Sequence, residues 1–259
     1  EDAGFDDEVA AWNRTFTHTP DVAIGAASAS DVVEAERFAR ANGLPVRVQG
    51  TGHGSHEAIT DGMLILTRRL DSLSIDADDR IATIGGGARW APVVEAAAAH
   101  GLAPVTGAAG TVGVAGFLLG GGFGPLVRSH GVASDYVREF EVVTADGDLV
   151  RANAERHPDL FWALRGGKGG PGIVTEVRLE LAPRRRLDDA ARAGGITEGI
   201  AIEGRRARGV AAGGGPLDCR AFIPTPVHAG GTVGADSPPP ANDQGRSSLD
   251  FRQSRRQGT

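Results

Sequence analysis

The pattern of hydrophobic and polar positions predicts a chain in which short strands and helices alternate. Short apolar or alternating runs bounded by Gly, Pro, Asn or Asp are typical of strands. Apolar residues spaced three and four apart are typical of helices that pack through one face. The strands are expected at residues 22–24, 45–48, 63–67, 81–84, 137–144, 149–151 and 173–181, and the helices at residues 31–41, 89–100 and 158–164. This loose alternation, in two lobes, favours an α+β fold over a uniform parallel sheet.

Local signals mark where several of these elements begin and end. Ser30 is expected to cap the first helix, and Asn42-Gly43 to end it. Pro158 is expected in the first turn of the last helix, where its missing N–H is not needed. The sequence Ala145-Asp146-Gly147-Asp148, between two apolar runs, is the strongest hairpin signal in the chain.

The pattern stops after Pro183. Residues 184–259 are rich in Arg, Gly, Ala and Pro, and their aromatic residues are Phe222 and Phe251. Such a composition buries too little apolar surface to offset the entropy lost on ordering. We therefore expect a folded domain at residues 1–183 and a largely irregular, low-order tail at residues 184–259. The abrupt change also leads us to expect that the tail arises from a reading-frame shift or is a degenerate end.

Composition and charge narrow the possible partners. The chain has 259 residues, of which 41% are hydrophobic, and a formal net charge of −6. Residues 1–183 carry 15 basic and 25 acidic side chains, whereas the tail carries 12 and 8. An acidic folded region argues against nucleic-acid binding. Because Cys219 is the sole cysteine, no intrachain disulfide can form.

The chain also lacks signals for membranes or secretion. No apolar run approaches the length of a membrane span, and the first residues lack a basic-then-apolar targeting pattern. We therefore expect a cytoplasmic protein without a membrane partner, and no bound metal.

A glycine turn follows the strand expected at residues 45–48. It reads Gln49-Gly50-Thr51-Gly52-His53-Gly54-Ser55. Its three glycines let the backbone turn sharply and bring N–H groups close to a ligand, as in sites that hold a pyrophosphate without cationic side chains. The same turn is expected to aim the imidazole of His53 at the bound group.

A second glycine-rich segment lies at residues 107–124. It reads Gly-Ala-Ala-Gly-Thr-Val-Gly-Val-Ala-Gly-Phe-Leu-Leu-Gly-Gly-Gly-Phe-Gly. Glycine clusters also occur in linkers and in several unrelated nucleotide sites, so neither segment is specific alone. Together, in this order, they are a much stronger signal of a bound dinucleotide.

With both segments in view, the chain resembles the FAD-linked oxidases of the vanillyl-alcohol oxidase superfamily, which have a PCMH-type FAD-binding domain, and within it the berberine-bridge-enzyme-like branch. The resemblance runs from about Asp6 to Pro183. It rests on Trp12-Asn13, Gly50–Gly54, Gly113–Gly116, Gly120–Gly124, Arg128–Asp135 and Pro158–Gly167. It implies two small α+β subdomains that hold FAD between them. It also implies an oxidoreductase that takes hydride from an alcohol, sugar or related C–H donor, with oxygen or another acceptor receiving the electrons.

The resemblance implies a covalent cofactor. The histidine at the position of His53 is joined through a ring nitrogen to the 8α carbon of the flavin, since a neutral imidazole is a nucleophile. Ala109 stands where some members carry a cysteine that makes a second link, so attachment through His53 alone is expected. The further residues expected to contact FAD are Gln49, Gly50, Thr51, Gly52, Gly54 and Ser55 in the first turn, Thr111, Val112, Gly113, Gly116, Gly120, Gly121, Gly122 and Gly124 in the second segment, and Gly172, Ile173 and Val174 near the last strand.

Other residues near these motifs have two interpretations. Lys168, the sole lysine, is either a contact of a phosphate or anionic flavin or a solvated surface residue. Asp135 is either a neighbour of the cofactor or the cap of a turn. His56 lacks a motif match, so we expect it to face solvent. Pro171 removes a backbone N–H donor just before Gly172, which weakens the expected flavin contact there.

Three classes of function compete. The first is the FAD-linked oxidoreductase, and the second is a truncated, catalytically silent flavin-binding module, because the tail does not resemble the substrate domain of the family. The third, a Rossmann-type dehydrogenase, is disfavoured because the third glycine of Gly50–Gly54 comes one residue too soon. No catalytic base is assigned, because relatives supply it from segments without a counterpart here. The donor and the oligomeric state also stay open.

Overall fold

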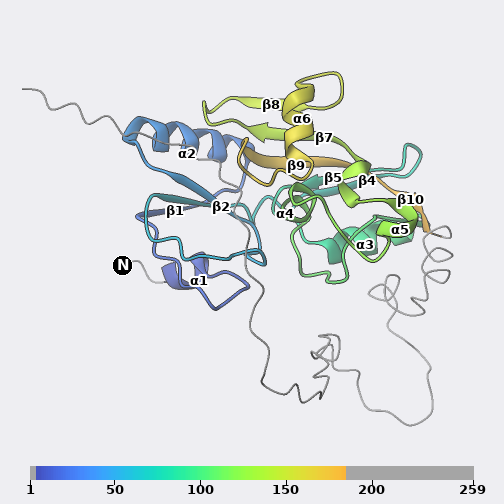
Figure 1. Cartoon of the computed structure of the whole chain (residues 1–259), viewed down its shortest axis with the longest axis horizontal. Coiled ribbons are helices and arrows are strands. Elements are labelled where there is room, and N and C mark those ends of the chain that lie inside the picture. Colours follow the sequence, from blue (N-terminus) through green and yellow to red (C-terminus); the bar gives the residue numbers. More distant parts are fainter. Residues whose placement is uncertain (1–3, 185–259) are drawn as a thin grey trace, which may run out of the picture. The chain divides into compact units, whose positions relative to one another are not determined.

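The structure, a computed structural model, describes residues 4–184. The strands of this part form two main sheets (Figure 1). The elements in chain order are α1 (Phe5–Val9), β1 (Val22–Gly25), α2 (Ala29–Asn42), β2 (Val46–Gln49), β3 (Met63–Leu66), β4 (Leu73–Asp76), β5 (Ile81–Gly85), α3 (Trp90–Ala99), β6 (Leu102–Ala103), α4 (Val114–Leu119), α5 (Val127–His130), the 3-10 helix η1 (Ala133–Tyr136), β7 (Val137–Val143), β8 (Leu149–Ala152), α6 (Pro158–Leu164), β9 (Ile173–Glu180) and β10 (Ala182–Pro183). The predicted α+β class is confirmed.

The first lobe is built on a three-stranded parallel sheet in the order β1-β3-β2. Its central strand, β3, is fully buried along its length, which explains its uninterrupted apolar sequence Met-Leu-Ile-Leu. Val32, Ala35 and Ala39 of α2 pack in one core cluster with Met63 and Ile65 of this strand. Helix α1 lies on the opposite side of the sheet from α2 (Figure 1). This lobe therefore presents the end of β2, and the turn after it, toward the rest of the fold.

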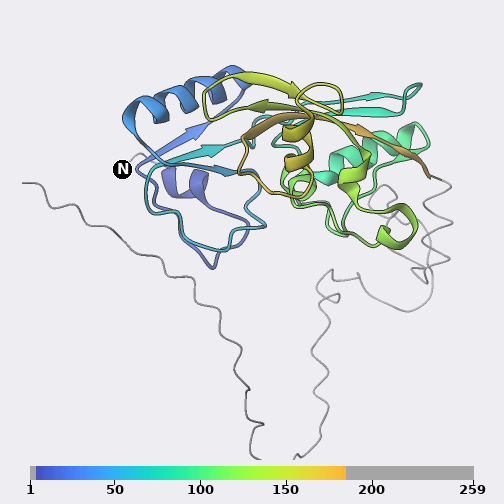
Figure 2. The same ribbon diagram turned by 45° about the horizontal axis from the view of Figure 1, so that its top comes forward.

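The second lobe is built on a five-stranded antiparallel sheet in the order β4-β5-β9-β7-β8. Helices α3, α4 and α6 lie on one side of this sheet (Figure 2) and share a core cluster with it, in which Trp90 and Phe140 are the largest buried side chains. The other face is polar: Arg151 Nη1 lies 3.2 Å from Glu139 Oε1, and Arg151 Nη2 lies 3.3 Å from Glu141 Oε2. Alternate residues of these strands therefore point to opposite faces of the sheet, one packed against helices and the other in solvent.

The element ends agree with the sequence except at one cap. The N-cap of α2 is Ser28, not Ser30: its hydroxyl accepts from the N–H of Asp31, whose carboxylate accepts from the N–H of Ser28. This reciprocal capping box satisfies two N–H groups that Ser30 could not reach from inside the helix. Gly43 ends α2 with φ of 65°, and the β7–β8 hairpin forms where the turn signal predicts it.

Several elements are not evident in the hydrophobic pattern. They include α1, β4, the two-residue strands β6 and β10, and helix α4 within the second glycine-rich segment. Glycine disfavours helices by about 1 kcal/mol relative to alanine, so the segment does not read as helical. Burial of Val114, Ala115 and Leu118 in the core outweighs that preference.

The predicted boundary between the domain and the tail lies at the end of the described residues. The expectation of a low-order tail, together with Cys219, lies outside them. Among residues 4–184, no helix has both the length and the apolar character that crossing a bilayer requires.

Candidate cofactor site

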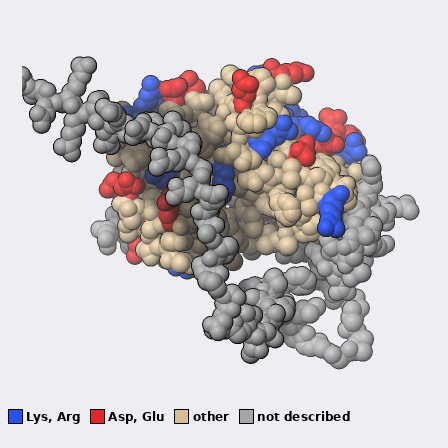
Figure 3. All heavy atoms as spheres, viewed as in Figure 1, with Lys and Arg blue, Asp and Glu red and all other residues tan. Residues whose placement is uncertain are grey.

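A pocket of about 680 Å³ lies between the two lobes, within the range of roughly 300–1,000 Å³ common for small-molecule and cofactor sites. Most predicted site residues line it: Gln49, Gly50, Thr51, Gly52, His53, Gly54, Ser55, Val112, Gly113, Gly116, Gly120, Gly122, Gly172, Ile173 and Val174. On the face seen in Figure 3, charged side chains lie along the upper, right-hand and left-hand margins, and uncharged residues form much of the surface to the right of its centre.

Three predicted residues are not part of the lining. Thr111 lies just behind it, against His53. Gly121 has φ of 90°, so glycine is needed there for the turn after α4. A Cβ at Gly124 would lie 2.4 Å from the carbonyl oxygen of Thr106, so glycine is needed there for close packing. These two glycines shape the wall from behind.

The His53 turn is held by the segment after α1. The N–H of Trp12 donates to the carbonyl oxygen of Thr51 at 3.0 Å, and the side-chain amide of Asn13 donates to the carbonyl oxygen of Ser55 at 2.8 Å. Gly52 has φ of 72°, which favours glycine. These contacts hold the turn in place.

The imidazole of His53 is restrained by two neighbours. Its Nε2 lies 3.2 Å from Thr111 Oγ1, and its ring stacks on Trp12 with ring centres 3.9 Å apart. Partial burial, and then the positive charge of Arg89, lower the pKa of His53 below its ordinary value. The ring is therefore neutral at physiological pH, which is the nucleophilic form.

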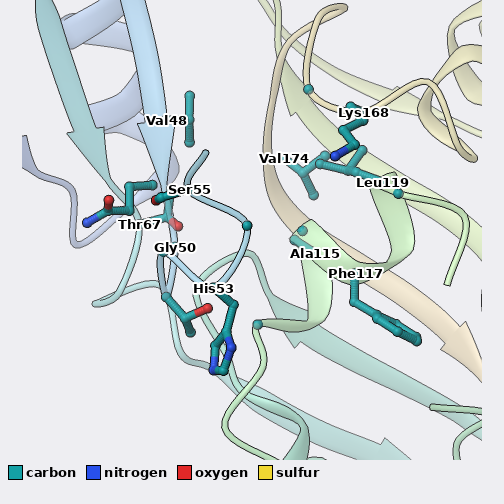
Figure 4. A pocket seen from close by; sticks show the side chains of 18 of the residues that line it. Val48, Gly50, His53, Ser55, Thr67, Ala115, Phe117, Leu119, Lys168 and Val174 are labelled. Carbon is teal, nitrogen blue, oxygen red and sulfur yellow. The ribbon is translucent and has the colours of Figure 1, made fainter. Parts of the chain in front are cut away.

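Helix α4 forms the wall opposite the turn. Figure 4 shows Ala115, Phe117 and Leu119 across the space from Gly50 and His53. A Cβ at Gly116 would meet no protein atom within 4 Å, and the same is true of Gly54 in the first turn. These two glycines are not required by packing within the described residues, so they form a cradle that side chains would fill. A flat ring can approach the backbone closely at such positions.

Two buried polar atoms belong to residues of the same lining. His18 is 2% exposed; its Nδ1 accepts from the N–H of Ile59, so the neutral ring carries its proton on Nε2. The Nε2 of Gln49 donates to the carbonyl oxygen of Val9, which leaves Oε1 as an acceptor. In the described part of the chain neither His18 Nε2 nor Gln49 Oε1 has a partner. A buried unpaired polar atom costs about 1–3 kcal/mol, so both atoms fit a ligand with polar groups of its own.

The structure adds lining residues that are not among the predicted contacts of FAD. They are His18, Arg47, Val48, Glu57, Ile59, Thr67, Gly86, Ala115, Phe117, Leu119, Phe123 and Gly169. His18 follows no motif, and it reaches the pocket only because the preceding loop pairs with the Ile59 region, where the N–H of Thr19 donates to the carbonyl oxygen of Ile59. Ala115 and Leu119, which are four residues apart, would have been expected on one face had α4 been recognised as a helix.

Three residues with open interpretations are now placed. Lys168 is exposed and lines the pocket, with its N–H donating to the carbonyl oxygen of Leu119 at 2.8 Å. His56 is exposed, as expected, but it also belongs to the lining. Asp135 is exposed in η1 and is not part of the lining.

The pocket suits a ligand with a flat part and a polar part. The flat part would lie against the glycines of the wall, and the polar part would pair with the buried donor and acceptor that lack partners. The fold and the site together define an α+β cofactor-binding domain. A model of the family described as "FAD binding domain" matches residues 20–153, just over half of the chain. The chain belongs to this family, within the vanillyl-alcohol oxidase superfamily of FAD-linked oxidases.

Curated relatives and solved structures agree with this assignment. The chain is 39% identical over 191 residues to (R)-6-hydroxynicotine oxidase of Paenarthrobacter nicotinovorans, a match that covers 72% of this chain and 42% of that protein. The crystal structure of 6-hydroxy-D-nicotine oxidase from Arthrobacter nicotinovorans matches with a TM-score of 0.66 and 36% identity, over 71% of this chain and 41% of the other. Glucooligosaccharide oxidase of Acremonium strictum matches with a TM-score of 0.62 and 34% identity, over 70% and 39%.

These comparisons confirm the PCMH-type fold and the resemblance to the flavin-binding half of the superfamily. The chain spans less than half the length of the three relatives.

Proposed function

We propose that the chain is the flavin-binding part of an FAD-linked oxidoreductase of the berberine-bridge-enzyme-like branch, with FAD joined covalently to His53 alone. The supporting observation is that the His53 turn and the glycine of α4 face each other across one pocket. Ala109 offers no thiol for a second link.

Different residues of the site would contact different parts of FAD. The N–H groups of residues 50–54 suit the pyrophosphate, and the open space at Gly116 suits a flat ring. Lys168, on the opposite side of the pocket, supplies a positive charge for a phosphate or for an anionic ring. When bound, FAD would accept a hydride from the donor and pass the electrons to oxygen or another acceptor.

The ring nitrogen that forms the link follows from the hydrogen bond to Thr111. In the tautomer whose Nε2 donates to Thr111 Oγ1, the lone pair of Nδ1 lies at the other edge of the ring. We therefore propose Nδ1 as the attached atom. The glucooligosaccharide oxidase match carries an 8α-N1-histidyl FAD by its own description.

We propose only the class of the donor, which is an alcohol, a sugar or a related C–H compound. The relatives are named for hydroxynicotine and for glucooligosaccharides, two unlike donors, so family membership does not choose between them. A small-molecule donor and an oxygen-type acceptor are the proposed partners. The cytoplasmic localisation and the absence of a nucleic-acid partner stay predictions.

A second candidate is a flavin-binding module without turnover of its own. It is favoured because the matched part corresponds to the flavin-binding half of the relatives, and binding FAD requires no more than the residues of that half. Steady oxidation of any donor by the isolated chain would remove this candidate and support the first.

The test of the first proposal is uptake of FAD by the full chain. Protein from riboflavin-limited cells is incubated with FAD in air, precipitated with acid and weighed by intact mass spectrometry. We expect yellow colour that stays with the precipitate and a mass increase of one FAD per chain. Protein that shows no adduct and no binding in a titration with FAD would contradict the proposal.

The lowered pKa of His53 predicts the pH dependence of attachment. Only the neutral ring attacks, so the rate is flat at high pH and falls below the pKa, which lies under the ordinary value of about 6.5. In Arg89→Gln the positive charge is lost, so the pKa rises and the midpoint of the rate profile moves to higher pH. The rate of adduct formation, measured at a series of pH values from 4.5 to 8, gives this midpoint. The control is Arg156→Gln, an exposed arginine outside the pocket, whose midpoint is expected to match the parent's.

A further inference from the structure

Trp12 is an exposed aromatic residue with an unusual contact. Its side chain is 62% exposed, yet its ring stacks on the imidazole of His53 with ring centres 3.9 Å apart and planes 16° apart. An exposed tryptophan of this kind contributes little to a hydrophobic core. The residue on which its ring stacks is the one that the proposed function joins to FAD.

The backbone around Trp12 is fastened to the turn that carries His53. The N–H of Trp12 donates to the carbonyl oxygen of Thr51 at 3.0 Å, and the N–H of Asn13 donates to that of Gly52 at 3.4 Å. A Cβ at Gly52 would lie 2.5 Å from the Cβ of Ala11, so the two segments approach as closely as glycine allows. We call residues 11–13 the clamp segment. It fixes the height and angle at which the Trp12 ring meets His53.

The stack restrains the imidazole without covering its reactive atom. The lone pair of a ring nitrogen lies in the ring plane, at the edge, whereas stacking occupies the face. Thr111 Oγ1 occupies the Nε2 edge at 3.2 Å. Trp12 on the face and Thr111 at the Nε2 edge together restrain the orientation of the ring.

We propose that Trp12 is a positioning residue for the covalent attachment of FAD to His53, an inference that rests on the function proposed above. In the attachment, a bond forms between His53 Nδ1 and the 8α carbon, and one C–H bond of that carbon breaks. The hydrogen from carbon, the proton from imidazole and the electron pair are finally taken up by dioxygen, which leaves as hydrogen peroxide. Trp12 exchanges no atom in this reaction. It holds the imidazole plane at the angle from which the bond forms.

The test separates the rate of attachment from the affinity for FAD. Parent, Trp12→Leu and Trp12→Phe chains from riboflavin-limited cells are mixed with saturating FAD in air, quenched with acid at timed intervals and weighed by intact mass. The dissociation constant for FAD is measured by flavin fluorescence before attachment proceeds. Trp162→Leu is the matched control, because Trp162 is 75% exposed on α6 and outside the pocket lining.

We expect Trp12→Leu to slow adduct formation about tenfold or more, since a misplacement of an ångström at a reacting group has effects of that size. Trp12→Phe, which keeps an aromatic face, is expected to recover most of the rate, and the dissociation constant is expected to stay at the parent value in both. Trp162→Leu should behave as the parent does.

Two results would overturn the inference while leaving the proposed function standing. One is attachment in Trp12→Leu at the parent rate. The other is a parallel decrease in FAD affinity and in melting temperature in Trp12→Leu, which would show that Trp12 stabilises the fold and does not specifically position His53. If the parent itself forms no adduct, the covalent function fails first, and the inference about Trp12 fails with it.

Discussion

Replacing His53 by alanine is expected to abolish the covalent adduct completely. The described lining offers no thiol, and Ala109 stands where a second link would need one. Because His53 is one of many residues that line the pocket, FAD should still bind reversibly to His53→Ala. Intact mass spectrometry after incubation with FAD should therefore show the bare chain, while the protein stays yellow until it is precipitated with acid.

The matched control for this variant is His100→Ala. His100 is exposed at the end of α3 and does not line the pocket, so its adduct is expected to equal that of the parent. A residual adduct in His53→Ala would show that another nucleophile makes the link. Peptide mapping of that adduct would identify it and overturn the assignment of His53.

Filling the cradle at Gly116 is expected to weaken FAD binding without harming the fold. A side chain there meets no protein atom within 4 Å, so Gly116→Leu has room in the protein itself. Leucine is also the better helix former, by up to about 1 kcal/mol, which should keep or raise the melting temperature of the FAD-free chain. In the complex the same side chain would occupy ligand space, and overpacking of this kind costs about 1–3 kcal/mol, or roughly 5- to 150-fold in the dissociation constant.

A fluorescence titration of His53→Ala with and without Gly116→Leu measures this effect free of covalent trapping. Gly170→Leu is the control, because a Cβ there also meets nothing within 4 Å but Gly170 is outside the lining. Equal affinities in the three chains would mean that the open space at Gly116 is not where the flat part of FAD lies.

Two requirements of the site can be seen in the sequence because they are local: glycine in the turn, and lining residues that are adjacent in the chain. A turn that approaches a ligand by its backbone needs glycine, and glycine is visible in the sequence. The residues from Gln49 to Ser55 are adjacent in the chain, so they line the same pocket once β2 ends where predicted. The same reasoning is less successful at Gly121 and Gly124, because glycine is also needed for turns and for close packing of backbone.

Secondary structure is likewise predicted where local patterns mark it and missed where tertiary burial stabilises it. Helices α2, α3 and α6 are predicted to within two residues at each end, because apolar spacing or a signal such as Pro158 marks each of them. Helix α4 is hidden by its glycines, since its stability comes from burial of Val114 and Leu118 in the core and not from local propensity. Ser28 is preferred to Ser30 as a cap because Asp31, three residues after Ser28, completes the capping box.

By itself, the sequence determined the α+β class, the flavin-binding family and the turn that carries His53, because these depend on local periodicity and on motifs whose order can be seen along the chain. Only the tertiary structure decided that Trp12 stacks on His53, that Thr111 hydrogen bonds to its Nε2, and that His18 joins the lining. These partners are separated by about 40 residues or more along the chain, and no local pattern records which segments packing will bring together.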